Sequence, residues 1–273
     1  MAATAGKRQV LRQELEPVLR CYLEGEDSDR LRAYILAHSG LPGPRANLEL
    51  AQVFAELVGQ VPAPDVQRAE VLLQEWTGMS AAAAPAGDPQ EFLPFCGAWA
   101  LGCLAAAHEP KVPETLNRLR ELAADERWRL REAVANGLQA LLAAHPAPTL
   151  AALTSWIQPG AWLEMRAVAA ALAEPSLLGN TELTRQATAL HHLILDQVEA
   201  AQDASPDFRT LRQALGYTVS VVVAAEPQAG ATLLDRLARS THLDLRWILR
   251  ENLKKARLAR ACPDLVQALR ERL

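Results

Sequence analysis

The chain has 273 residues, half of them apolar, and a formal net charge of −4. This apolar content excludes an intrinsically disordered chain, which combines few apolar residues with a high net charge. The small negative charge also argues against a uniformly basic nucleic-acid-binding protein.

Helical periodicity begins near the N-terminus. Apolar residues recur at three- and four-residue steps over residues 10–23, which predicts a helix with one buried face. A second helix is expected to end before Gly40. The proline-rich segment that follows predicts a rigid turn, with Pro44 suited to be the first residue of a third helix. That helix is expected to end near Val58, and a fourth to cover residues 65–76.

Residues 79–89 form a low-complexity segment rich in Ala, Pro and Gly, which predicts a linker or an exposed loop. It separates N-terminal helical repeats (1–78) from a helical-repeat array (90–273). We expect one continuous solenoid, and the alternative is a small N-terminal helical bundle joined to the array. Within the array, short breaks at Pro and Gly separate further helices. The β-branched stretch 217–225 continues a helical pattern and is assigned to a helix.

An internal repeat is the strongest pattern. Residues 128–132 (Trp-Arg-Leu-Arg-Glu) recur as residues 247–251 (Trp-Ile-Leu-Arg-Glu), and two segments between them place an aromatic residue one turn before an arginine. The repeat arginines, 35, 46 and 38 residues apart, are Arg131, Arg166, Arg212 and Arg250. A period near 40 residues is typical of solenoids built from helix pairs. The predicted fold is therefore an all-α, right-handed α-α superhelix.

Residues 125–134 carry a family resemblance. With their acidic start and inner arginine they resemble the second-helix motif of HEAT repeats, and residues 92–108 and 244–253 are similar more loosely. The resemblance covers residues 88–273 and extends to uncharacterised bacterial HEAT-like proteins and, more distantly, to HEAT-like alkylpurine DNA glycosylases. It implies an armadillo-like helical solenoid and leaves the activity open, because HEAT arrays host many functions.

The glycosylases carry a tryptophan–aspartate motif on an inner helix, where the carboxylate stabilises the developing sugar cation. In this sequence no carboxylate lies within one turn after Trp99. Glu164 points to a different helix face from Trp162, and Trp128 has only Glu132, beside an arginine. We therefore expect a non-enzymatic protein with no catalytic residue and no cofactor.

The repeat arginines allow two interpretations. In HEAT arrays the inner arginine commonly pairs with an acidic residue of a neighbouring repeat, and Asp125, Asp207 and Asp244 are available for such an internal ladder. Alternatively, the second helices line the concave surface and present their arginines to an acidic ligand.

The C-terminal part of the chain is locally basic. Residues 235–273 contain ten Lys/Arg and five Asp/Glu, a charge of +5, so residues 1–234 carry −9. Four of these basic residues are spaced by four, four and three and are predicted to share one helix face: Arg246, Arg250, Lys254 and Arg257. Such a stripe suits a phosphate backbone or an acidic protein surface. A solvated face on the terminal repeats explains it equally.

The segment from Ser39 to Asn47 is stiffened by two prolines and leads into a helix N-terminus. It is suited to present Arg45 and Asn47 to a ligand. A tight turn between helices explains the same residues.

Cysteines and histidines do not indicate a metal site. The four cysteines form no C-x-x-C pair and are expected to be reduced: Cys21, Cys96, Cys103 and Cys262. The adjacent His191 and His192 point about 100° apart on a helix and cannot easily share one metal ion. No signal peptide or membrane span is expected, which predicts a cytoplasmic protein.

The favoured function is a scaffold that binds a protein or peptide partner on its concave face. The alternative is nucleic-acid binding through the basic C-terminal repeats, related to DNA alkylation-repair proteins but without glycosylase activity. The predicted binding residues are Arg45, Arg131, Arg166, Arg212, Arg246, Arg250, Lys254 and Arg257.

Overall fold

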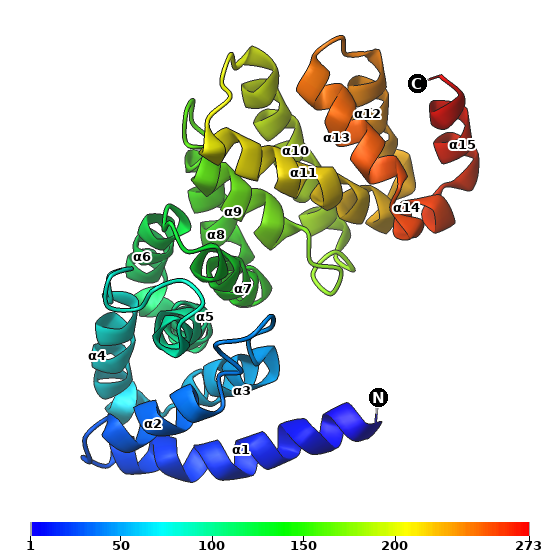
Figure 1. The fold of residues 1–273 in the computed structure, drawn as a ribbon. Coiled ribbons are helices and arrows are strands. Elements are labelled where there is room, and N and C mark those ends of the chain that lie inside the picture. Colours follow the sequence, from blue (N-terminus) through cyan, green and yellow to red (C-terminus); the bar gives the residue numbers. More distant parts are fainter. Residues whose placement is uncertain (1, 273) are drawn as a thin grey trace. The chain divides into compact units, whose positions relative to one another are not determined.

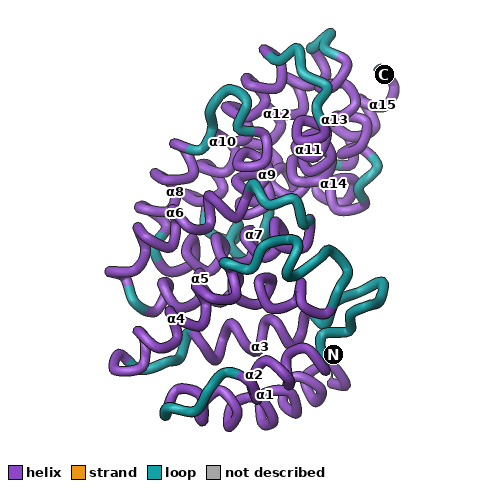
Figure 2. Tube along the Cα trace, turned by 60° about the vertical axis from the view of Figure 1, so that its left-hand side comes forward, coloured by secondary structure: helices purple, strands orange, loops and turns teal. Residues whose placement is uncertain are grey.

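A computed structural model describes residues 2–272, in which α-helices are joined by short loops and 3-10 turns and no strand occurs (Figures 1 and 2). The helices form two compact units, Met1–His145 and Pro146–Leu273. The division between the units falls after the helix that ends at Ala144. We describe each unit separately.

Unit 1 is built from seven α-helices. They are α1 (Ala2–Leu23), α2 (Asp29–Ala37), α3 (Leu48–Val58), α4 (Val66–Thr77), α5 (Phe92–Ala107), α6 (Val112–Ala123) and α7 (Trp128–Ala144). Three short 3-10 turns lie between them: η1 (Ala63–Asp65), η2 (Pro89–Glu91) and η3 (Glu109–Lys111).

The helices of unit 1 pack in two layers. Within one layer α5 lies between α3 and α7, while α4 packs on α5, and α6 packs on both α5 and α7. In the core, the ring of Phe54 stacks on that of Trp76; the ring centres are 5.2 Å apart and both side chains are fully buried. Where α5 crosses α7, Gly102 faces Gly137 so closely that the two backbones touch.

Unit 2 repeats this arrangement with eight helices. They are α8 (Pro146–Ser155), α9 (Trp162–Leu172), α10 (Thr181–Ala200), α11 (Pro206–Ala225), α12 (Pro227–Arg239), α13 (Leu243–Leu253), α14 (Ala256–Ala261) and α15 (Pro263–Glu271). Here α11 lies between α9 and α13, α10 packs on α11, and α12 packs on α11 and α13. Four of these helices begin with proline, whose missing N–H costs nothing at a helix start. The β-branched stretch 217–225 is the end of α11, as predicted.

The repeat predicted from the arginines is confirmed by the helix register. Arg131, Arg166, Arg212 and Arg250 lie on α7, α9, α11 and α13, which are alternate helices along the chain. The side-by-side packing of α9, α11 and α13, each accompanied by a helix of the other layer, is that of an α-helical repeat. The predicted all-α repeat fold is therefore correct.

Buried polar side chains join neighbouring helices of unit 2. Asn252 on α13 is fully buried; its amide nitrogen donates to the carbonyl of Leu215 at 2.8 Å, and its oxygen accepts from the backbone N–H of Ser220 at 2.7 Å. His191 on α10 is also fully buried and lies 3.1 Å from the hydroxyl of Thr218 on α11. Such satisfied buried contacts fix one register between helices.

One predicted detail differs in the structure. α3 begins at Leu48 and not at Pro44, because Asn47 is the N-cap and accepts a hydrogen bond from the N–H of Leu50. The segment 79–89 is a loop of unit 1 and is mostly exposed, as predicted, with Ala84 buried. Arg127, itself buried, donates from its guanidinium to the carbonyls of Met79 and Ala84.

Candidate functional site

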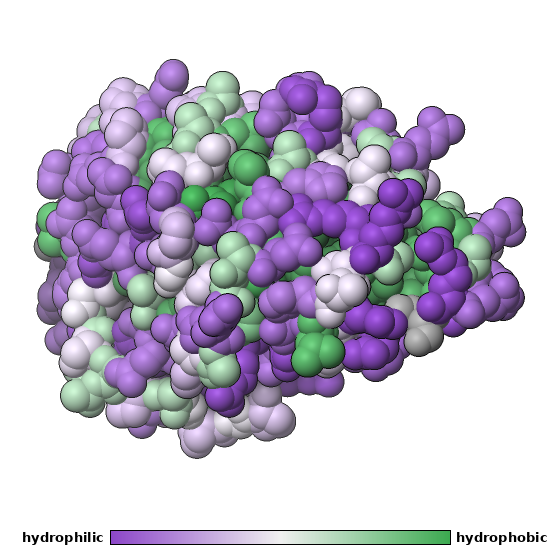
Figure 3. All heavy atoms as spheres, turned by 90° about the horizontal axis from the view of Figure 1, so that it is seen from above, coloured by the Kyte–Doolittle hydropathy of each residue, from purple (hydrophilic) through white to green (hydrophobic). Residues whose placement is uncertain are grey.

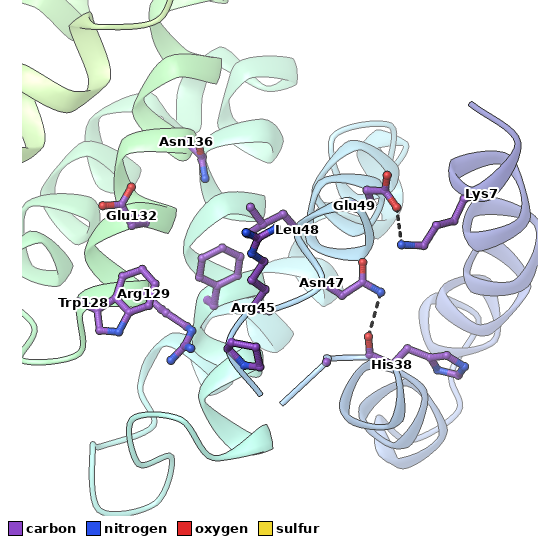
Figure 4. Close-up of a pocket in the computed structure, with 14 residues that line it drawn as sticks. Lys7, His38, Arg45, Asn47, Leu48, Glu49, Trp128, Arg129, Glu132 and Asn136 are labelled. Atoms are coloured by element: carbon purple, nitrogen blue, oxygen red, sulfur yellow. Dashed lines mark hydrogen bonds and ion pairs between the residues drawn. The ribbon is translucent and has the colours of Figure 1, made fainter. Parts of the chain in front are cut away.

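An open pocket with a volume of about 860 Å³ lies in unit 1. It is lined by residues of α1, α3, α5 and α7 and of the loop between α2 and α3: Lys7, His38, Gly40, Pro44, Arg45, Ala46, Asn47, Leu48, Glu49, Phe95, Trp128, Arg129, Glu132 and Asn136 (Figure 4). Its size is in the range of ligand sites, which are typically ~300–1,000 Å³.

The loop between α2 and α3 is held in shape by its own hydrogen bonds. The N–H of Asn47 donates to the carbonyl of Ser39 at 2.7 Å, and the side-chain amide of Asn47 donates to the carbonyl of His38 at 2.9 Å. Gly40 has φ +75°, a left-handed conformation that favours glycine, and Leu41 of the same loop is buried. The loop therefore presents Arg45 from a closed, preformed turn.

On the α7 side, an aromatic ring and a guanidinium stack at the pocket wall. The Arg129 guanidinium carbon lies 4.6 Å from the ring centre of Trp128, whose side chain remains largely accessible at 53%. Arg129 is only 10% exposed at its side chain and donates to Oε2 of the fully buried Glu91 at 3.0 Å. The same oxygen accepts from the N–H of Gly87, which anchors the arginine to the segment before α5.

Two large exposed apolar side chains meet at this pocket. Leu48 and Trp128 are 57% and 53% exposed, and both line it. Single exposed apolar residues are ordinary on protein surfaces, and Figure 3 shows apolar residues at several separate places on a largely hydrophilic face. Two together in one pocket, beside polar groups, are typical of a binding site.

The repeat arginines have different environments. Arg212 forms an ion pair with Asp244 of the next inner helix and lies 4.5 Å from the ring centre of Trp247, as the internal-ladder interpretation predicts. Arg166 is buried. Arg131 donates to the carbonyls of Asp125 and Glu126, which lie just before its own helix. Arg250 is exposed on α13.

The predicted basic stripe does not lie on one helix. α13 ends at Leu253, Lys254 is its C-cap, and Arg257 belongs to α14, so only Arg246 and Arg250 share a helix. The spacing of four, four and three passes through a helix break that neither Gly nor Pro marks. Lys254 is also paired, to Glu251.

The described residues contain no cluster of three or more potential metal ligands, and none of their helices is long and apolar enough to cross a bilayer. Cys96 is fully buried, as predicted, and burial raises the pKa of its thiol. Burial also raises the pKa of Cys103 to about 12. Both thiols stay protonated and unreactive at neutral pH.

Of the predicted binding residues, Arg45 lines this pocket, and so does Asn47, which the same loop was predicted to present. Sequence reasoning noted Asn47 and Trp128 but assigned no binding role to Arg129 or Asn136. The sequence did show that Arg129 is adjacent to Trp128 and that Asn136 follows about two turns later on the same predicted helix. Nothing in the sequence placed that helix next to the loop of Arg45.

Comparison with known proteins adds little to this description. No protein-family model and no curated protein matches the chain. An engineered protein solved by the Northeast Structural Genomics Consortium is similar over 91% of this chain and 97% of its own, at 16% identity and a TM-score of 0.38. A designed armadillo repeat protein is similar over 82% and 99%, at 14% identity and a TM-score of 0.29. The helical-repeat assignment rests on the helix packing within this chain.

Proposed function

We propose that this chain is a HEAT-type binding module whose unit 1 pocket receives an extended segment of a partner protein. The observation that carries the proposal is that Trp128 and Leu48, both exposed, line one open pocket together with polar side chains. Aromatic and arginine side chains are the residues that most often dominate binding energy at protein interfaces. The Arg212–Asp244 pair between neighbouring inner helices supports the HEAT-type interpretation.

An extended peptide matches the polar groups of the pocket. Asn136 is half-buried on α7, and its side-chain amide has no hydrogen-bond partner among the described residues. An amide both donates and accepts, so it can bond the N–H and C=O groups that an extended backbone leaves unpaired. The apolar side chains on either side then contact the side chains of the same segment.

The proposal is tested by panning a phage-displayed library of random twelve-residue peptides against the whole protein. We expect the wild-type protein to enrich peptides that the Trp128→Ala variant does not retain. Val71→Ala is the matched control, because Val71 is similarly exposed, at 52%, on α4 of the same unit and lies outside the pocket. Absence of enrichment, or equal enrichment on Trp128→Ala, contradicts the proposal.

Nucleic-acid binding by unit 2 is the second candidate, and one observation favours it. The side chains of Arg246, Arg250 and Arg257 have no ion pair or hydrogen bond with any described residue, and they lie within two consecutive helices. Unpaired arginines of this kind suit phosphate groups. The test is the affinity for duplex DNA by fluorescence anisotropy at low and physiological salt, where unchanged affinity of an Arg246→Glu, Arg250→Glu variant refutes this candidate.

A further inference from the structure

The charged side chains around the unit 1 pocket leave one positive charge without a counter-charge. Lys7 pairs with Glu49 at 2.7 Å, and Arg129 pairs with Glu91 behind the pocket wall. Glu132 also takes part in an interaction. Arg45 is exposed and has no ion pair or hydrogen bond to any residue that the structure describes.

We infer that the segment bound in this pocket carries an acidic side chain, whose carboxylate is received by Arg45 and Asn136 while a large apolar residue of the same segment packs on Trp128. This inference rests on the proposed function and names the class of peptide. Figure 4 shows the guanidinium of Arg45 and the amide of Asn136 directed from opposite sides into the same space. A guanidinium and an amide are both donors to carboxylate oxygens.

The pocket wall on α7 contains a second arginine, Arg129, whose charge is already balanced by Glu91. The Nε of Arg129 is buried and has no hydrogen-bond partner, and its guanidinium bonds Glu91 through Nη1 alone. Because the charge of Arg129 is balanced by Glu91, the cation that faces a ligand in this pocket is Arg45. A basic segment would meet Arg45 with like charge, so the pocket is expected to reject it.

A carboxylate fits the pocket better than a phosphate group. Arg45 is the one lining cation without a counter-charge, and it matches the single negative charge of Asp or Glu. A phosphate group carries close to two negative charges and is usually held by a cluster of arginines.

The helix geometry fixes the expected spacing along the peptide. Trp128 and Asn136 are eight residues apart on α7, which corresponds to about 12 Å at the helical rise of about 1.5 Å per residue. An extended peptide covers about 3.3 Å per residue, so the same distance takes about three to four peptide residues. The acidic residue is therefore expected three or four positions from the large apolar residue.

The experiment uses the peptides enriched by the wild-type protein in the panning described above. We expect them to contain Asp or Glu three or four positions from an aromatic or large aliphatic residue. Replacing that Glu by Gln, or Asp by Asn, should weaken binding to the wild-type protein about tenfold, the typical effect of losing a charged hydrogen bond. The same peptide change should have less than about a twofold effect on the Arg45→Gln variant, because the partner charge is already absent.

Matched variants separate the inference from the proposed function. Arg120 and Asn117 lie on α6, outside the pocket, and their side chains form no hydrogen bond or ion pair with any described residue. The variants Arg120→Gln and Asn117→Ala should therefore bind the peptides like the wild type. If enriched peptides lack an acidic position, or if Arg45→Gln binds them as tightly as Arg120→Gln does, the inference is wrong, while the pocket still binds peptides. If nothing is enriched, the proposed function itself fails. Circular dichroism on every variant checks that it is folded.

Discussion

Replacing Gly102 by alanine is expected to force α5 and α7 apart. A Cβ atom at Gly102 would lie 2.2 Å from the carbonyl oxygen of Gly137 and 2.4 Å from its Cα, whereas ordinary contacts begin at 3.4 Å. The two helices must therefore separate by about 1 Å at their crossing, because the obstacle is backbone that cannot rotate away. Phe95 on α5 and Trp128 on α7 line the pocket from these two helices, so the pocket would change with them.

The cost follows from two opposing effects. Overpacking a core typically costs about 1–3 kcal/mol, and a clash with backbone belongs at the upper end of this range. Alanine recovers about 1 kcal/mol of helix propensity relative to glycine. We therefore expect Gly102→Ala to lower the free energy of unfolding of unit 1 by about 2 kcal/mol.

Equilibrium urea unfolding, followed by circular dichroism and tryptophan fluorescence, measures this change. Gly6→Ala is the matched control, since a Cβ at Gly6 on α1 meets nothing within 4 Å and should be neutral or stabilise the helix by up to about 1 kcal/mol. If Gly102→Ala is as stable as the wild type, the close approach of α5 and α7 is wrong, and with it the geometry of the pocket.

Two further predictions concern unit 2. Burial lowers the pKa of His191 to about 4, below its value of 6.5 in the unfolded chain. As the pH falls, the unfolded chain therefore binds the proton first, and the free energy of unfolding decreases between pH 6.5 and pH 4. Urea unfolding at pH 7 and pH 4.5 should show a loss of about 2–3 kcal/mol through this residue that is absent in His191→Gln, and an equal loss in both proteins refutes the assignment. Asn252→Ala should destabilise the unit by about 2–4 kcal/mol, because it leaves the N–H of Ser220 and the carbonyl of Leu215 buried without partners. A loss below about 0.5 kcal/mol would contradict that bonding.

The repeat could be predicted from the sequence because each unit of the repeat carries its own local pattern. An aromatic residue followed by an arginine marked α7, α9, α11 and α13 correctly. Helix ends were predicted correctly where Gly or Pro ends the helix, as at Gly59 after α3. They were missed where a polar capping residue sets the helix boundary. Because Asn47 is the N-cap, α3 begins after it and not at Pro44. α13 ends at Leu253, where no Gly or Pro is present, so the predicted basic stripe is split between two helices.

The pocket could not be predicted in full, because it depends on contacts between distant parts of the chain. The loop of Arg45 and the wall of Trp128 are more than 80 residues apart in sequence and line one pocket through the packing of α3, α5 and α7. The role of Arg129 was hidden for the same reason, since its partner Glu91 lies in the turn before α5. Sequence patterns report helix faces, whereas the pocket depends on which helices become neighbours.

The most direct test of the account is the affinity of one enriched peptide for two variants of the whole chain, measured by fluorescence anisotropy. The account predicts that Trp128→Ala weakens binding by about tenfold or more, as expected for an aromatic residue central to an interface, while Val71→Ala binds like the wild type. Equal affinities for the two variants would show that the peptide binds elsewhere and would contradict the assignment of the unit 1 pocket as the binding site.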